Sequence, residues 1–146
     1  MKRFFCVISI LLIISLLPFG VFAVENEGAS TYASDFFTAT TAYVYSVDDD
    51  TFGVWFDVLG KYKMDAIGAS SVRIQRSANG TSSWTTVKTF SSATYSNLLS
   101  YNTVFHGDSV THTGTQGYYY RAYVIFYAEK GGNTGRYASY TDVIHL

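Results

Sequence analysis

From Phe36 onward, apolar and polar residues alternate along the chain, which is typical of β-strands with one buried face. Residues 52–58 place apolar side chains at every even position, whereas Trp55 lies on the opposite face. Residues 43–47 alternate in the same way, and the acidic residues 48–50 lie between the two runs. This arrangement predicts two antiparallel strands joined by a tight turn.

A second pair of strands is predicted in the middle of the chain. Residues 71–77 (SVRIQRS) and 84–90 (WTTVKTF) are rich in β-branched residues. They flank Asn79-Gly80, a dipeptide that tolerates the positive φ angles of a hairpin turn. Residues 60–69 are the one stretch in which the pattern allows a helical turn.

The last third of the chain predicts further strands. Residues 91–114 have a weaker pattern that indicates one or two short strands. Residues 117–128 (GYYYRAYVIFYA) predict a strand in the middle of a sheet, and a glycine-rich turn at 131–135 leads into a last strand at 137–144.

Alternation divides the strand at 117–128 into two faces. The inward face is expected to carry Tyr118, Tyr120, Ala122, Val124, Phe126 and Ala128. The outward face is expected to carry Tyr119, Arg121, Tyr123, Ile125 and Tyr127. We further expect the following residues to be buried together: Val72, Ile74, Tyr118, Tyr120, Val124 and Phe126.

These elements predict an all-β fold, an antiparallel β-sandwich of seven to eight strands. It would form a single domain over residues 36–146, preceded by a flexible lead-in at 24–35.

The first 23 residues have the features of a secretory signal peptide. Lys2 and Arg3 precede an apolar run at 4–17, and Pro18 comes before small residues that end at Ala23. An uncleaved membrane anchor is the alternative, because the apolar stretch is just long enough to span a bilayer. We expect cleavage after Ala23 and a secreted, extracellular product.

Composition narrows the possible partners. Removing Lys2 and Arg3 from the ten basic residues leaves eight, against eleven acidic residues. Nucleic acid is therefore not an expected partner, nor is a membrane after signal cleavage. Residues 24–146 contain no cysteine, so the core alone must hold the domain together.

From about residue 71 to residue 143 the chain resembles a bacterial fibronectin type III domain. The matching stretches are VRIQRS, then NGTSS, then WTTV, followed by Gly117, Tyr118, Tyr120 and Arg121. The resemblance implies a fibronectin type III- or immunoglobulin-like sandwich, with Tyr118 as the corner tyrosine whose hydroxyl bonds to the backbone upstream.

The whole chain also resembles a set of short, secreted, uncharacterised proteins of Gram-positive bacteria, through ASTYASDFFT, WFDV and GYYYRAY. This resemblance implies a compartment and a fold, and it brings no activity with it. The first half departs from the fibronectin pattern, because Trp55 faces away from its apolar neighbours and residues 24–146 lack proline.

Catalytic and metal-binding sets are weak in this sequence. His106, Asp108 and His112 are close enough in the chain to suggest a metal site, but exposed loop residues are the preferred interpretation. The acidic residues 48–50 lack the spacing of a calcium loop. No nucleophile elbow is present, and Asp57 and Asp65 have no evident carboxylate partner. We therefore expect no enzyme, no metal and no cofactor.

The aromatic content, 18% of residues, is the feature that stands out. The outward residues Tyr119, Arg121, Tyr123 and Tyr127 are the candidate binding residues. Tyr119, Tyr123 and Tyr127 would lie about 13 to 14 Å apart along the strand, so a ring such as Tyr137 or Tyr140 would have to fill the gaps.

Three functions remain open from the sequence. The leading hypothesis is a non-enzymatic extracellular binding or interaction module whose partner is an unknown protein or polysaccharide. The alternative is a carbohydrate-binding module that uses exposed aromatic rings. The third is a small secreted toxin or bacteriocin.

Overall fold

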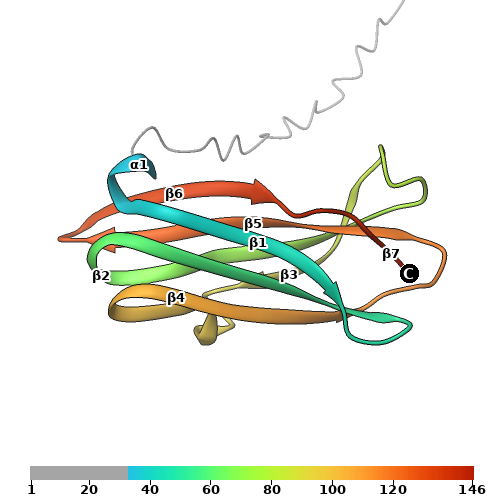
Figure 1. Ribbon diagram of the computed structural model, residues 1–146, viewed down its shortest axis with the longest axis horizontal. Coiled ribbons are helices and arrows are strands. Elements are labelled where there is room, and N and C mark those ends of the chain that lie inside the picture. Colours follow the sequence, from blue (N-terminus) through green and yellow to red (C-terminus); the bar gives the residue numbers. More distant parts are fainter. Residues whose placement is uncertain (1–32) are drawn as a thin grey trace, which may run out of the picture.

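The computed structural model describes residues 33–146, which form an antiparallel sheet of seven strands that curls on itself (Figure 1). The predicted signal peptide (1–23) and the lead-in up to residue 32 lie outside the described residues. The elements are α1 (Ala33–Phe36), β1 (Phe37–Ser46), β2 (Thr51–Ser77), β3 (Thr85–Ser91), the 3₁₀ turn η1 (Ser96–Leu98), β4 (Leu99–Thr113), β5 (Tyr119–Lys130), β6 (Asn133–Tyr140) and β7 (Ile144–His145). The prediction of an all-β antiparallel fold is confirmed.

One strand, β2, organises the sheet. Its first part, 51–59, pairs with β1 on one side and with β4 on the other. Its second part, from residue 66 to residue 77, pairs with β5, and residues 71–76 also pair with β3. β6 then pairs with β5, which lies between β2 and β6 as the sequence predicted for an interior strand.

The stretch at 60–69 contains no helical turn, because β2 continues through it. Met64 and Ile67 are completely buried, and their backbones pair with β4 at Thr103 and Ser100. The backbone at Gly60 lies close to these side chains, since a Cβ atom there would be 3.0 Å from Met64 and 3.1 Å from Ile67. Two register shifts in β2 break the period of two here, which is why the pattern looked sparse.

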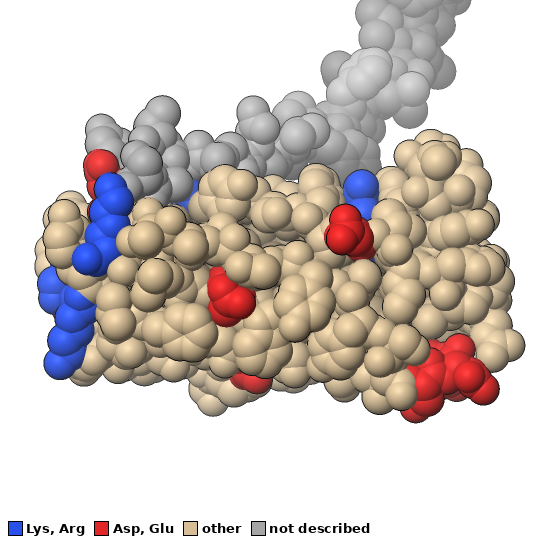
Figure 2. Space-filling view, in the orientation of Figure 1, with Lys and Arg blue, Asp and Glu red and all other residues tan. Residues whose placement is uncertain are grey.

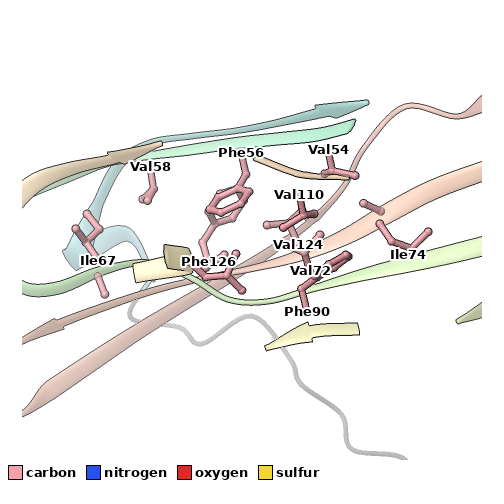
Figure 3. Packing of buried hydrophobic residues seen from close by; sticks show 14 of the residues in the cluster. Val54, Phe56, Val58, Ile67, Val72, Ile74, Phe90, Val110, Val124 and Phe126 are labelled. Carbon is pink, nitrogen blue, oxygen red and sulfur yellow. The ribbon is translucent and has the colours of Figure 1, made fainter. Parts of the chain in front are cut away.

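The core lies between the two parts of β2 (Figure 3). Val54, Phe56 and Val58 point toward side chains of the second part of β2 and of β5, among them Val72 and Phe126. Five of the six residues expected to be buried together are at most 1% exposed: Val72, Ile74, Tyr120, Val124 and Phe126. Tyr118 is only partly buried and packs against the edge of this cluster.

Both predicted hairpins are present. The turn between β1 and β2 is closed by the backbone N–H of Val47, which donates to the carbonyl of Thr51 at 2.9 Å. In the turn between β2 and β3, Gly80 has φ +73°. The side-chain oxygen of Asn79 accepts hydrogen bonds there from the backbone N–H groups of Thr81 and Ser82.

Two predictions on strands need correction. Residues 91–114 contain one long strand, β4, after the turn η1. The polar run 99–113 shows little alternation, but it forms a strand because its backbone pairs with β2. The last strand is interrupted at Thr141, whose hydroxyl accepts the backbone N–H of Ala122 at 2.9 Å, so that β6 ends before β7 begins.

The tyrosine whose hydroxyl bonds to the backbone upstream is Tyr120, whereas this role was expected of Tyr118. The backbone N–H of Thr115 donates to the Tyr120 hydroxyl oxygen at 2.7 Å. Tyr118 precedes β5, and its ring lies 4.5 Å from the Arg76 guanidinium. The structure selects Tyr120 because that position points into the core toward Gly114, where a Cβ would lie 2.8 Å from the tyrosine ring.

Candidate binding face on the outer side of β5

The outward side of β5 carries the sequence-predicted site residues. Tyr119, Arg121, Tyr123 and Tyr127 are all partly exposed, as expected from alternation. Ile125 is the exception, since it is only 4% exposed. It lies in the interior of the sheet, where it pairs with Ser71 on β2 and with Ala138 on β6.

Tyr119 does not join the other tyrosines. Its ring lies 4.3 Å from the ring of His145 on β7. A Cβ on Gly80 would lie 2.8 Å from the Tyr119 ring, so this tyrosine covers the Asn-Gly turn. The predicted ladder is therefore broken at its first member, which has a structural role.

Arg121 is held between two aromatic rings. Its guanidinium carbon lies 4.3 Å from the ring centre of Trp84 and 4.1 Å from that of Tyr140. Its Nε donates to the side-chain oxygen of Gln75 at 2.9 Å. Tyr123 extends the group, because its ring centre lies 4.7 Å from that of Tyr140. We call these five residues the arginine cluster.

Within the arginine cluster, Tyr140 lies against Arg121 on one side and beside Tyr123 on the other. Tyr137 does not fill a gap in the ladder, because it pairs with the inward residue Phe126 and stacks on its ring at 6.2 Å. Trp84 and Gln75 come from other elements, before β3 and on β2. Only the strand pairing brings them to Arg121.

A hollow of about 300 Å³ opens at the other end of the same face, beside Tyr127. We call it the Tyr127 hollow; its walls are Ala66, Ser70, Ser92, Leu99, Tyr101, Tyr127, Glu129 and Arg136. The Tyr127 hydroxyl donates to a Glu129 carboxylate oxygen at 2.9 Å, and the Arg136 guanidinium lies 5.9 Å from the Tyr127 ring centre. Burial raises the pKa of Tyr127, and Glu129 raises it further, so the hydroxyl stays a donor at neutral pH.

Sequence reasoning missed Glu129, Arg136 and Tyr101 as neighbours of Tyr127. Glu129 follows Tyr127 by two residues, and alternation alone would place both on one face. Arg136 is the direct partner of Tyr127 in the β5–β6 pairing, which the short glycine turn at 131–132 fixes. Tyr101 comes from β4, and only the bend of β2 brings it near.

The interpretation of His106, Asp108 and His112 as exposed loop residues is wrong, because all three lie in β4 and His106 is buried. His106 is bonded through Nδ1 to the Ser100 hydroxyl at 2.8 Å, and Asp108 accepts from the Asn97 amide at 2.6 Å. His112 instead packs on the ring of Phe52. Over residues 33–146 the side chains of His, Cys, Asp and Glu nowhere form a group of three that could hold a metal ion.

The two carboxylates considered from the sequence are likewise bonded within the fold. Asp57 accepts the indole N–H of Trp55 at 3.0 Å. Asp65 accepts from the Lys130 ammonium and from the backbone N–H of Gly131. Among the contacts of residues 33–146, Asp57 and Asp65 bind different partners and do not face each other across a cleft.

A second group of rings lies on the outward side of β1, β2 and β4. Tyr45 lies directly over Gly53, and a Cβ on Gly107 would lie 3.0 Å from Phe105 and 3.2 Å from Trp55. These rings cover strand glycines, which is a structural role. In the view of Figure 2, the surface is mostly uncharged between an acidic end near the β1–β2 turn and a basic end on the opposite side.

Among residues 33–146 no helix is both long and apolar enough to cross a membrane. Comparison of the chain with protein-family models, with curated proteins and with solved structures finds no match.

Proposed function

We propose that this chain is a secreted, non-enzymatic module that binds an extracellular protein or polysaccharide through the outer face of β5. The observation that carries the proposal is the arginine cluster, in which Arg121 is held between Trp84 and Tyr140. Tyrosine, tryptophan and arginine are the residues that dominate binding energy at protein interfaces. A side chain already fixed in place loses little further freedom when a partner docks.

The surroundings of Arg121 support a role in binding. Its hydrogen-bond partner is the neutral Gln75, and both stacked rings leave part of their surface in water; Tyr140 is 51% exposed. Among the contacts described for residues 33–146, the Arg121 guanidinium meets Gln75 and two rings and forms no ion pair with a carboxylate. A partner that presents a carboxylate, or a surface rich in acidic groups and hydroxyls, would complement the Arg121 guanidinium.

We further propose that the curled sheet is a fibronectin type III-like sandwich. Support comes from the strand order, since β1, β2 and β4 form one group and β3, β2, β5 and β6 form another. Side chains of the two groups face each other in the core (Figure 3). The corner hydrogen bond of Tyr120 is a further feature of such sandwiches.

A carbohydrate-binding function is the second candidate. The Tyr127 hollow favours it, because aromatic rings and both hydrogen-bond donors and acceptors converge there.

The test of the main proposal is retention of proteins and of cell-wall polysaccharide from culture medium on the immobilised mature chain, residues 24–146. Arg121→Ala and Tyr140→Ala should abolish retention, whereas Tyr43→Ala, which removes an exposed ring on β1, should not change it. Near-ultraviolet circular dichroism checks that each variant is folded. Retention that survives Arg121→Ala in a folded protein would contradict the proposal.

A further inference from the structure

We propose that the Tyr127 hollow is a binding subsite for a single neutral hexopyranose ring of a saccharide. This inference rests on the proposed function and deepens it, because it assigns a ligand class to one end of the β5 outer face. It involves residues that lie outside the arginine cluster.

The size of the hollow fits a small ligand. Its volume of about 300 Å³ lies at the lower end of the range for small-molecule sites. Its walls come from β2, β4, β5 and β6 and from the residue that follows β3, so paired strands hold most of the lining in place. A site on paired strands needs little rearrangement to bind.

The charges in the hollow favour a neutral ligand. Glu129 supplies one negative charge and Arg136 one positive charge, so the pair contributes no net charge. Neither forms an ion pair with the other among the described contacts. An anion would be attracted by Arg136 but repelled by Glu129, and a cation would meet the reverse, so neither charge gains a net advantage. An uncharged molecule in addition avoids the cost of removing a charge from water.

The polar groups match a ligand rich in hydroxyls. Glu129 only accepts hydrogen bonds, Arg136 only donates them, and Ser92 does both. The Ser70 hydroxyl donates to the backbone carbonyl of Ile125 at 3.2 Å, so it is left as an acceptor. A sugar hydroxyl also does both, so neighbouring hydroxyls of one ring can donate to Glu129 and accept from Arg136. The bond from Tyr127 holds one oxygen of the Glu129 carboxylate and thereby orients the other.

The rings supply the apolar contact that a sugar needs. Tyr101 is 66% exposed at the rim of the hollow, and its ring makes no aromatic contact within residues 33–146. Tyr127 is fixed by Glu129 and Arg136 and forms a wall. The C–H face of a pyranose ring can therefore pack on Tyr101 while its hydroxyls reach the polar groups.

The experiment is an amide NMR titration of the isotope-labelled mature chain. The probes are the methyl glycosides of glucose, galactose, mannose and N-acetylglucosamine, each added to tens of millimolar. Glucuronic acid and glucosamine are the charged controls, and triglycine is the competing probe with both an ammonium and a carboxylate group. At least one neutral glycoside should give saturable shifts at Ser70, Ser92, Tyr101 and Glu129, and the two charged sugars should bind more weakly.

Variants then localise the binding. Tyr101→Ala removes an exposed ring and should weaken binding of that glycoside by about tenfold or more, equivalent to at least 1.4 kcal/mol. Glu129→Ala should do the same, and Tyr43→Ala should leave binding unchanged. The Tyr101 variant is the decisive one, because loss of an exposed ring does not threaten the fold.

Several results would overturn the inference. They are the absence of saturable shifts with all four glycosides, equal binding by folded Tyr101→Ala, and tighter binding of triglycine than of any sugar. If a glycoside shifts only amides around Arg121, the subsite is wrong while the proposed binding face stands. If Arg121→Ala leaves partner retention intact, the proposed function fails whatever the glycosides do.

Discussion

The backbone N–H of Thr115 and the hydroxyl of Tyr120 are joined by a hydrogen bond of 2.7 Å, which ties the corner before β5 to the core. Replacing Tyr120 by phenylalanine keeps the ring and leaves the Thr115 N–H without its partner. We expect Tyr120→Phe to lower the free energy of unfolding by about 1 to 2 kcal/mol, measured by urea denaturation. Tyr118→Phe is the matched control and should change it by less than about 0.5 kcal/mol. The reverse order of effects would contradict the assignment of the stabilising hydrogen bond to Tyr120.

Gly68 tests the close approach of β2 to the turn η1. It has φ +152°, and a Cβ there would collide with the backbone carbonyl oxygen of Leu98. We expect Gly68→Ala to destabilise the protein by about 3 kcal/mol or more, because a backbone cannot move aside as a side chain can. Gly117→Ala is the control: it also has positive φ, +83°, but has open space around it. That variant should lose only about 1 to 2 kcal/mol, so equal losses would argue against the collision.

Stability should fall in mildly acidic solution because of two histidines. Burial lowers the pKa of His106 below its usual 6.5, although nearby Asp108 opposes the shift. Burial also lowers the pKa of His112, and Lys88 adds to the effect. The unfolded chain therefore binds protons more readily, so stability is complete above pH 6.5 and is lost as the pH falls through the folded pKa values.

The measurement is the midpoint of urea denaturation between about pH 7.5 and pH 5, a window above the usual pKa of 3.8 for Asp48 and Asp65. His106→Asn keeps a polar group near the Ser100 hydroxyl and removes the titration. Its midpoint should depend less on pH than that of the unchanged protein. An unaltered slope would show that His106 does not carry the effect.

Arg121→Lys tests whether the planar guanidinium is needed in the arginine cluster. Lysine keeps the charge but cannot stack between Trp84 and Tyr140 or present the same donor to Gln75. We expect retention of the extracellular partner to fall to the level of Arg121→Ala, with the free energy of unfolding changed by no more than about 1 kcal/mol. Full retention by the lysine variant would mean that charge alone is recognised.

The sequence predicted local features better than distant ones. Alternation located β1, the first part of β2 and β5, and the Asn-Gly pair located the turn into β3, because these depend on neighbours in the chain. The bend of β2 at 60–66 was missed, since the register shift between Leu59 and Met64 interrupts the alternation while Met64 and Ile67 remain in the core. Ile125 was misjudged for a related reason, because alternation does not show that strands pair with this residue on both sides.

For the candidate site, too, the sequence predicted local features but not distant contacts. Alternation gave Tyr119, Arg121, Tyr123 and Tyr127 one common side, as the structure has them. It could not tell that Tyr119 covers the Asn-Gly turn while Arg121 meets Trp84 and Tyr140. Such differences depend on which strands become neighbours, and strand order is set by contacts far apart in the sequence.

The length of β2 has a consequence for the kinetics of folding. This strand of 27 residues is the hydrogen-bonding partner of β1, β3, β4 and β5, and its second part meets β5 about 50 residues further along the chain. Long loops must close before those pairs form, which places folding in the millisecond-to-second range of proteins rich in distant contacts. The local hairpins β1–β2, β2–β3 and β5–β6 can assemble early, whereas the outer face of β5 is complete only once β5 has paired with the distant second part of β2.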